Sequence, residues 1–313
     1  MNKLISVAMT SYNGEEYIEE QVESIISQTY KNLEIIICDD HSSDRTLEIL
    51  RKLKNRDKRI TLIENNQNLG FKKNFEKAIS FCKGDYIALS DQDDIWERNH
   101  IELLYKKIGN CSIACGNCIL IDSKGDSLNR KLNEVDGLFC LPYDNNYLYK
   151  IIFDRNCFQG ASMLLCKDFV TKTLPIPEEI KFHDVWFALN AMFQNGINYS
   201  FEIVNNYRQH GKNVTFKGHN VIKRSLCEKI ISKIKIMFGI VPTDRFTYIS
   251  ELKKIYGDTN KDLNEIENFF SRMTFVKKIL FLWEKYEFIT TKKGHKGFIK
   301  KFIVLLKWRN IDE

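Results

Sequence analysis

The sequence predicts an α/β fold built around a parallel β-sheet. In the first third of the chain, short apolar runs of strand length alternate with amphipathic stretches of helix length. Such alternation implies a parallel sheet with helices on both faces, joined by right-handed crossovers. The chain has 313 residues, of which 43% are hydrophobic and 28% charged, so it can bury one sizeable core and a smaller appendage.

Four apolar runs in this region have the length of buried strands. They are LISVAM at 4–9, LEIIICDD at 33–40, ITLIE at 60–64 and YIALS at 86–90. The helices predicted between them cover residues 15–28, 44–54 and 70–82. In the first helix, Ile18, Val22 and Ile25 form an apolar face. Ser42 and Ser43 precede the second helix and can cap it.

The middle of the chain is less regular. The elements expected there are a strand at 112–122, a polar loop region at 126–150, a strand at 157–166, a helix at 178–194 and a strand from 199 into the RQH turn. Gly160 is small enough for another backbone to approach closely. Pro175 and Pro177 delay the start of the helix.

Polar clusters follow all four early strands. They are Thr10 to Gly14, Asp39-Asp40, Asn65 to Gly70 and Asp91 to Asp94. Functional groups in parallel sheets gather beyond the carboxyl ends of the strands, so these clusters predict a site at one sheet edge. A dinucleotide site is not expected, because no G-x-G-x-x-G follows the first strand.

The last cluster lies in GDYIALSDQDDIWERNH, where acids stand between apolar residues. One interpretation is a metal site, because Mg²⁺ and Mn²⁺ prefer oxygen ligands. The other is that Asp94 caps the helix predicted after it, where the helix dipole favours an acid. The cap suits Asp94 alone better than the whole cluster, and we favour the site for the cluster as a whole.

Six stretches in order carry a family resemblance: ISVAMTSYNGEEYIEEQVESIISQTYKNLEIIICDDHSSDRT, NLGFKKNFEKAI, GDYIALSDQDDIW, FQGASML, HDVWFAL and YRQHGKN. Over residues 3 to 215 they resemble the inverting glycosyltransferases of family 2. The resemblance implies the GT-A fold, a Rossmann-like nucleotide-diphospho-sugar transferase fold. Within the family, the pattern is most similar to enzymes labelled rhamnosyltransferases or capsule and O-antigen glycosyltransferases.

The resemblance implies a Mn²⁺ or Mg²⁺ cofactor, which would act as a Lewis acid at the leaving diphosphate. Asp91-Gln92-Asp93 matches the family's DxD motif. Asp93 is then expected at the metal and Asp91 at the metal or the donor ribose, with Asp94 as the alternative ligand if the motif slips by one residue. His210 matches a late histidine that binds the metal, and a plain surface histidine is the alternative.

The resemblance also implies a pyrimidine diphosphate sugar donor. The residues expected to bind its nucleotide are Thr10, Tyr12, Asn13, Asp39, Asn68, Gly70 and Asp91. Asp39 is expected to accept a hydrogen bond from the imide N–H of uracil or thymine. Asp40 instead suits a helix cap. Lys72 or Lys73 can contact phosphate or lie on an exposed helix face.

Asp184 is the expected catalytic base. Inversion needs a group that takes the proton of the acceptor hydroxyl during in-line attack, and the resemblance assigns this role to a carboxylate that opens a helix. The alternative is an acid that only stabilises the helix dipole. His183, Trp186 and Arg208 are candidates for acceptor or diphosphate contacts. Trp186 equally suits the core, and Arg208 equally suits pairing with a strand-end acid.

The charge balance changes along the chain. Residues 1–214 carry 26 Lys and Arg against 30 Asp and Glu, whereas residues 215–313 carry 21 against 11. We therefore predict a catalytic domain at 1–215 and a basic, mostly helical region at 216–313. Its amphipathic segments are VIKRSLCEKIISKIKIMFGI, MTFVKKILFLWEKY and HKGFIKKFIVLLKWRN.

Two interpretations of this region stay open. Basic faces with aromatic edges suit an anionic membrane surface, which would bring the site to a lipid-linked acceptor. The same helices also suit packing on the catalytic domain or on another subunit, including a second copy of the chain. Nucleic acid is not expected, because the aromatic residues fall on the apolar faces.

A cytoplasmic protein is expected, or one bound peripherally at the inner face of the cell membrane. The start has no signal-peptide pattern, and no apolar run reaches the roughly 18 residues of a membrane span. Cysteines stand singly in apolar runs, which is typical of reduced thiols. Cys111, Cys115 and Cys118 are interpreted as buried thiols instead of a zinc site.

Together these observations predict an inverting, metal-dependent glycosyltransferase of bacterial surface-polysaccharide synthesis, which moves a sugar from a UDP- or dTDP-sugar to a saccharide hydroxyl. One rival is a catalytically inactive sugar-nucleotide-binding subunit of a synthase complex, which would not need the base Asp184. Another is a metal-dependent phosphohydrolase, which would explain the acids but not the residues expected at the pyrimidine.

Overall fold

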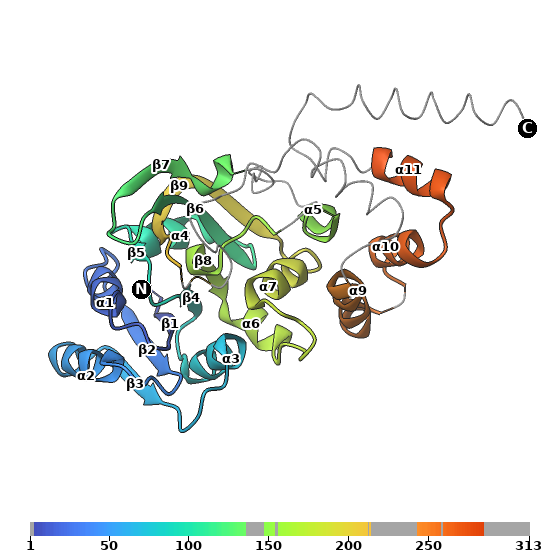
Figure 1. The fold of residues 1–313 in the computed structure, drawn as a ribbon. Coiled ribbons are helices and arrows are strands. Elements are labelled where there is room, and N and C mark those ends of the chain that lie inside the picture. Colours follow the sequence, from blue (N-terminus) through green and yellow to red (C-terminus); the bar gives the residue numbers. More distant parts are fainter. Residues whose placement is uncertain are drawn as a thin grey trace, which may run out of the picture. The chain divides into compact units, whose positions relative to one another are not determined.

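The structure, a computed structural model, describes residues 3–135, 147–153, 156–211, 213, 243–257 and 259–284 (Figure 1). The chain forms two compact units. The first comprises Met1–Asn145 with Asn156–Lys223, and the second comprises Asn146–Arg155 with Arg224–Glu313. The domain boundary predicted at residue 215 remains a prediction.

The first unit is built on a β-sheet whose first half is parallel. Its strands there are β1 (Ile5–Ser11), β2 (Leu33–Asp39), β3 (Ile60–Glu64) and β4 (Tyr86–Ser90), in the spatial order β3-β2-β1-β4. The predicted parallel α/β arrangement is thus confirmed. Ser11 pairs with Asp39, and Asp39 with Glu64, so the carboxyl ends of these strands meet at one edge.

The second half of the sheet is mixed. Its strands are β5 (Ile95–Trp96), β6 (Ile113–Ile121), β7 (Ser127–Lys131), β8 (Met163–Cys166) and β9 (Ile197–Arg208). Strand β8 runs antiparallel to both β4 and β6, while β9 runs parallel to β6 and pairs with the short β5. This pairing brings the end of β9 next to the segment that follows β4.

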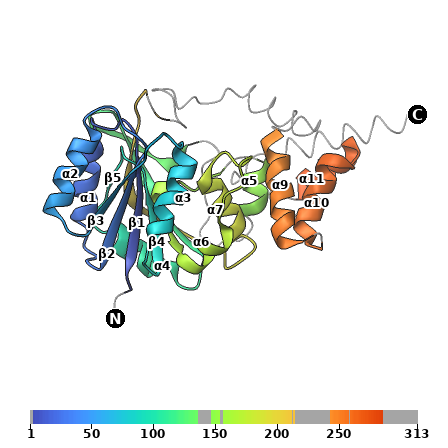
Figure 2. The ribbon, with the colours of Figure 1, turned by 90° about the horizontal axis from the view of Figure 1, so that it is seen from below.

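Helices cover both faces of the sheet. They are α1 (Ile18–Ile26), α2 (Thr46–Arg56), α3 (Phe71–Phe81), α4 (His100–Ile108), α6 (Lys167–Thr173) and α7 (His183–Ala191). Figure 2 shows α1 and α2 on one side of β1–β3 and α3 on the other. Val22 of α1 and Leu50 of α2 are fully buried in the same cluster as Ile35 of β2, as the apolar periodicity of the helices predicts.

Several expected boundaries were wrong. The polar region at 126–150 contains β7, a 3₁₀ turn at Leu132–Glu134 and helix α5 (Tyr147–Phe153). In the strand expected at 157–166, Gly160–Ser162 forms a 3₁₀ turn, and only β8 is extended. The helix expected from 178 begins at His183. The pattern failed here because tertiary packing overrides local propensity in short segments.

The second unit is helical in its described part. It contains α5, α9 (Thr243–Tyr256), α10 (Lys261–Ser271) and α11 (Phe275–Glu284). Leu252, Leu263 and Phe269 are fully buried, and the Tyr149 hydroxyl donates to Asp262 over 2.8 Å. The amphipathic segments predicted at 221–240 and 295–310 lie outside the described residues. Within those that are described, no helix has the length and apolar character needed to cross a bilayer.

Candidate active site

The acid turn, Asp91–Asp94, connects β4 to β5 at the carboxyl edge of the sheet. Asp91, Gln92 and Asp93 are half-buried, and Asp94 is fully buried. The clusters predicted after β1, β2 and β3 end at the same edge. The strand-end rule thus located the candidate site correctly in the fold.

Asp94 anchors this turn to β9. Its Oδ1 accepts a hydrogen bond from the Arg208 backbone N–H over 3.0 Å, and its Oδ2 accepts from Asn205 Nδ2 over 2.7 Å and lies 3.4 Å from Gln159 Nε2. The helix-cap interpretation of Asp94 is wrong, because β5 follows it and Asn99 is the residue that precedes α4.

Asp93 and His210, both predicted metal ligands, lie side by side. His210 Nε2 is 2.8 Å from Asp93 Oδ2, and the His210 ring packs on Tyr17 with centroids 5.0 Å apart. Asn213 shapes the turn that carries the histidine, since its amide donates to the Arg208 carbonyl over 3.1 Å and its Oδ1 accepts from the His210 N–H.

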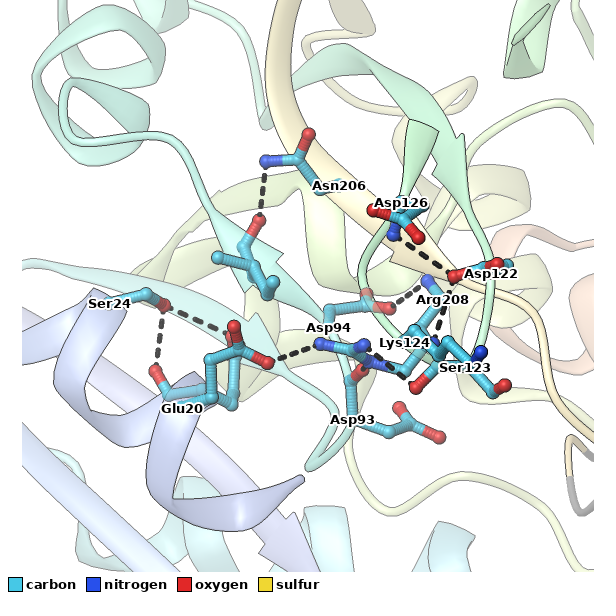
Figure 3. A network of polar contacts seen from close by, with 12 residues as sticks. Glu20, Ser24, Asp93, Asp94, Asp122, Ser123, Lys124, Asp126, Asn206 and Arg208 are labelled. Atoms are coloured by element: carbon cyan, nitrogen blue, oxygen red, sulfur yellow. Dashed lines mark hydrogen bonds and ion pairs between the residues drawn. The ribbon is translucent and has the colours of Figure 1, made fainter. Parts of the chain in front are cut away.

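Arg208 is a buried cross-link between the acid turn, the segment at Ser123 and Glu20 of α1 (Figure 3). Its guanidinium donates to the Asp93 carbonyl over 2.8 Å, to the Ser123 carbonyl over 3.2 Å and to Glu20 Oε2 over 2.5 Å. The guanidinium carbon also lies 4.8 Å from the Tyr17 ring centroid. The acid partner is therefore Glu20 of α1 and not a strand-end residue, and a diphosphate contact of Arg208 remains a prediction.

The loop after β1 carries the residues predicted at the nucleotide. Thr10 is buried, whereas the Tyr12 side chain is 48% exposed. Asn13 has a positive φ of 47°, and its Oδ1 accepts from the Ser43 N–H over 2.8 Å. This loop is thereby tied to the segment that follows β2.

Asp39 is fully buried at the end of β2. Its carboxylate accepts from Ser11 Oγ over 2.8 Å, and from Ser42 through both the N–H, over 2.9 Å, and the hydroxyl, over 2.6 Å. The expected capping of α2 by Ser42 is wrong, because its hydroxyl binds Asp39 and Arg45 is the residue that precedes the helix. The base-recognition role of Asp39 remains a prediction.

Asp40, interpreted from sequence as a helix cap, instead shapes the loop at 65–70, which we call the donor-side loop after its predicted role. Its two oxygens accept from the Leu69 N–H over 2.7 Å and from the Gly70 N–H over 2.8 Å. Asn68 Oδ1 also accepts from the Gly70 N–H over 3.0 Å. Gly70 has a φ of 81°, in the region where glycine carries no steric penalty.

Asp184 lies in the first turn of α7 and is partly exposed, as expected of a base that opens a helix. Burial raises its pKa to about 6, against opposing hydrogen bonds from the Val185 N–H over 2.7 Å and from Asn156 Nδ2 over 3.1 Å. Sequence reasoning missed Asn156, which stands in no motif and lies 28 residues from the carboxylate that it orients.

The other two candidates near Asp184 are buried. Trp186 is fully buried and its indole N–H donates to the Thr173 carbonyl over 2.9 Å, which matches the core alternative. His183 packs on Phe75 with centroids 4.2 Å apart, and neither of its ring nitrogens has a hydrogen-bond partner among the described residues. A Cβ on Gly160 would lie 3.0 Å from the His183 ring, so this glycine does permit a close approach.

An aromatic pair lies beside the predicted base. The Phe71 ring, 37% exposed, stacks on Phe182 with centroids 6.1 Å apart, and the Lys181 ammonium lies 5.1 Å from the Phe182 centroid. Phe71 follows the donor-side loop, and Phe182 directly precedes the His183-Asp184 pair. The pair therefore presents apolar ring surface at the same sheet edge.

Lys72 joins α3 to the segment before α7. Its ammonium donates to the carbonyls of Pro177, Glu178 and Ile180 over 2.8–2.9 Å, so all three of its N–H groups have protein acceptors. Neither sequence interpretation, a phosphate contact or an exposed helix face, anticipated this. Lys73 pairs with Glu76 at 3.4 Å and, within the described residues, donates to no carbonyl of that segment, whereas Glu76 accepts from the Ile176 N–H.

The acid turn offers the carboxylate oxygens that a divalent cation prefers as ligands. Partial burial, with the nearby Asp93 and Asp184 carboxylates, raises the pKa of Asp91 to about 7, as expected where carboxylates are crowded. No three His, Cys, Asp or Glu side chains are close enough to hold a metal within the part of the chain described. A cation here would need further oxygen ligands from a bound diphosphate or water.

Comparison with known proteins gives the family. The model of glycosyl transferase family 2 matches residues 6–169. The chain belongs to this family. An uncharacterized glycosyltransferase of Haemophilus influenzae is 30% identical over 326 residues, which cover 96% of each chain. WfgD of Escherichia coli, named a UDP-Glc:α-D-GlcNAc-diphosphoundecaprenol β-1,3-glucosyltransferase, is 31% identical over 62% of this chain and 72% of its own length.

Solved structures agree on the GT-A fold. Mannosyltransferase PcManGT from Pyrobaculum calidifontis superposes with a TM-score of 0.56 at 14% identity, over 97% of this chain and 88% of that chain. TarS of S. aureus gives a TM-score of 0.53 at 15% identity, over 91% and 81%. At such identities the likeness concerns the fold alone, and the predicted GT-A fold is confirmed.

Replacing Lys72 tests its role in this glycosyltransferase. Lys72→Met removes three hydrogen bonds to the segment before α7, so we expect kcat to fall by about tenfold or more as Asp184 loses its fixed position. Nucleotide affinity, measured by calorimetry, should stay unchanged. Lys73→Met is the matched control and should behave like the wild type. A loss of nucleotide affinity in Lys72→Met, with kcat retained, would instead indicate a phosphate contact.

Proposed function

We propose that the chain is an inverting, metal-dependent glycosyltransferase that moves a sugar from a UDP- or dTDP-sugar to a saccharide hydroxyl. The observation that carries the proposal is the meeting of two separate carboxylate groups at one sheet edge. Asp184 is near enough to the acid turn to help raise the pKa of Asp91. A leaving diphosphate and an attacking hydroxyl need these two functions close together.

The acid turn would serve the leaving group. Because the predicted ligands Asp91, Asp93 and His210 do not form a three-residue metal site, we propose that Asp93 and His210 would hold a divalent cation together with diphosphate and water oxygens. The cation would neutralise charge that develops on the diphosphate. Tyr12 is 48% exposed next to this turn, and we propose that its ring contacts the nucleotide. Asp39 is proposed to recognise the pyrimidine, in agreement with relatives named for UDP-Glc and with the neighbour TarS, which was crystallised with UDP-GlcNAc.

Asp184 would serve the acceptor. Its carboxylate takes the proton of the acceptor hydroxyl while that oxygen attacks the anomeric carbon from the side opposite the diphosphate, which gives inversion. Asn156 and the Val185 N–H fix the carboxylate and favour its charged form. We place the acceptor sugar on the Phe71 and Phe182 rings, because aromatic faces suit the C–H surface of a sugar.

Surface-polysaccharide synthesis is the proposed setting. Relatives are named for a diphosphoundecaprenol acceptor, for teichuronic acid biosynthesis and for chondroitin synthesis. A lipid-linked acceptor would suit the basic region at 216–313, which we propose as a membrane-facing part, with residues 1–215 as the catalytic domain. Vesicle flotation with and without residues 216–313 tests this, and equal binding of both forms to anionic vesicles would refute it.

Calorimetric titration of UDP and dTDP, with and without Mn²⁺, tests donor and metal together. We expect binding that Mn²⁺ strengthens, and a loss of about tenfold or more in Asp93→Asn. The matched control is Asp85→Asn, since Asp85 forms only a surface pair with Lys3 at 2.8 Å. No binding of either nucleotide in the presence of Mn²⁺ would overturn the proposal.

Removal of the base should stop turnover while sparing the donor site. We expect Asp184→Asn to lower kcat by about 10²–10⁴-fold with unchanged UDP affinity. In the wild type, kcat/KM should fall as the pH drops through about 6, where Asp184 takes up a proton. UDP release from UDP-glucose, with a GlcNAc-diphospho-lipid acceptor, is the assay. Donor binding without turnover in the wild type would instead favour the inactive-subunit alternative.

Two phenylalanines at opposite ends of α3 test the acceptor surface. Phe71→Ala should raise the acceptor KM about 2- to 10-fold, the range for one aromatic contact, and leave the donor KM unchanged. Phe81 is 45% exposed at the far end of the helix, so Phe81→Ala is the matched control. Equal effects of both variants, or a changed donor KM in Phe71→Ala, would contradict the assignment.

A further inference from the structure

Gln92 of the acid turn pairs with the backbone of the loop at 10–14, which follows β1 and which we call the nucleotide loop after its predicted role. Its Oε1 accepts from the Tyr12 N–H over 2.7 Å, and its Nε2 donates to the Tyr12 carbonyl over 3.0 Å. A side-chain amide thus forms the two-bond pattern that a neighbouring strand would form. These residues are 80 positions apart, so the contact connects the two loops that follow β1 and β4.

Gly14 leaves the space that this amide occupies. A Cβ built on Gly14 would lie 2.4 Å from Gln92 Oε1 and 2.6 Å from its Cδ, closer than real Cβ contacts. The Gly14 backbone cannot easily withdraw. Its N–H donates to Thr46 Oγ1 over 2.8 Å, and its carbonyl accepts from the N–H groups of Tyr17 and Ile18 over 3.0 Å. A Cβ at position 14 would therefore displace the Gln92 amide, and it would not strain a left-handed backbone.

The chemistry of position 92 is also restricted. The turn already contains Asp91, Asp93 and Asp94, so a glutamate at position 92 would add a fourth carboxylate and place an acceptor against the Tyr12 carbonyl. An asparagine would be one methylene too short for both bonds at the observed separation. A neutral amide of glutamine length satisfies both the charge and the distance.

We propose that Gln92 is a positioning residue that sets the spacing between the nucleotide loop and the acid turn. This inference rests on the proposed function, which assigns the nucleoside of the donor to the nucleotide loop and its diphosphate to the acid turn. Tyr12 has a half-exposed side chain, so packing does not fix this part of the loop. The amide clamp then couples the nucleotide and metal contacts, so that each strengthens the other.

A double-mutant cycle tests the clamp by calorimetry with UDP, with and without Mn²⁺. We expect Gln92→Ala and Gly14→Ala each to reduce the Mn²⁺-induced gain in UDP affinity by about tenfold, while metal-free UDP affinity stays unchanged. The double variant should be no worse than Gln92→Ala, because the added Cβ then meets no amide. Gln92→Glu, which keeps the side-chain shape, should lose the gain as Gln92→Ala does.

The possible results distinguish a failure of the proposed clamp from a failure of the proposed function. If the wild type binds UDP and Mn²⁺ strengthens this binding, but the variants keep the full gain, the clamp alone is refuted. It is also refuted if the cost of Gly14→Ala persists unchanged in the double variant, or if all losses follow a lowered thermal midpoint. If the wild type binds neither UDP nor dTDP with Mn²⁺ present, the proposed function fails and the clamp fails with it.

Discussion

The candidate site depends on one buried carboxylate, Asp94. A charge without solvent is costly unless it is hydrogen-bonded, and Asp94 meets this need with the Arg208 N–H and the Asn205 amide of β9. Burial, followed by repulsion from Asp93 and Asp91, raises its pKa well above the ordinary value. The acid turn therefore cannot leave the end of β9 without exposing unsatisfied groups on both sides, and this fixes Asp93 next to His210.

Charged side chains also hold the other loops of the site in place. Asp39 and Asp40 follow one another at the end of β2, yet each carboxylate is used for a different loop: Asp39 accepts from the segment that follows it, and Asp40 holds the donor-side loop through the Gly70 N–H. Lys72 then extends from the start of α3 to the carbonyls before α7. Each loop of the site is thus bound to a neighbour by at least one charged group, which restricts their relative movement before any ligand arrives.

The sequence predicted the location of the site but not the contacts that hold it. Apolar alternation located β1 to β4 and hence the position of Asp91 and Asp93, because strand period and strand-end position are local properties. Asp184 was identified only through the family resemblance. Gln92, Asn156 and Lys72 escaped, since their partners lie 80, 28 and more than 100 residues away and no local pattern encodes such a pairing. Short elements such as β7 and α6 were missed because packing, and not propensity, decides them.

The charged groups near the acid turn fall into two sets. Some are occupied by hydrogen bonds within the protein, and others stay available to a ligand. Arg208 and Asp94 are the most buried charged groups near the turn, and their hydrogen bonds to protein occupy them. The guanidinium binds the Asp93 backbone carbonyl and leaves that carboxylate to face His210. The Arg208 guanidinium thus holds α1 to the acid turn. The half-buried part of the turn keeps more carboxylates than positive groups. Such a surface repels a bare diphosphate, which is why the proposed function includes a divalent cation at this turn.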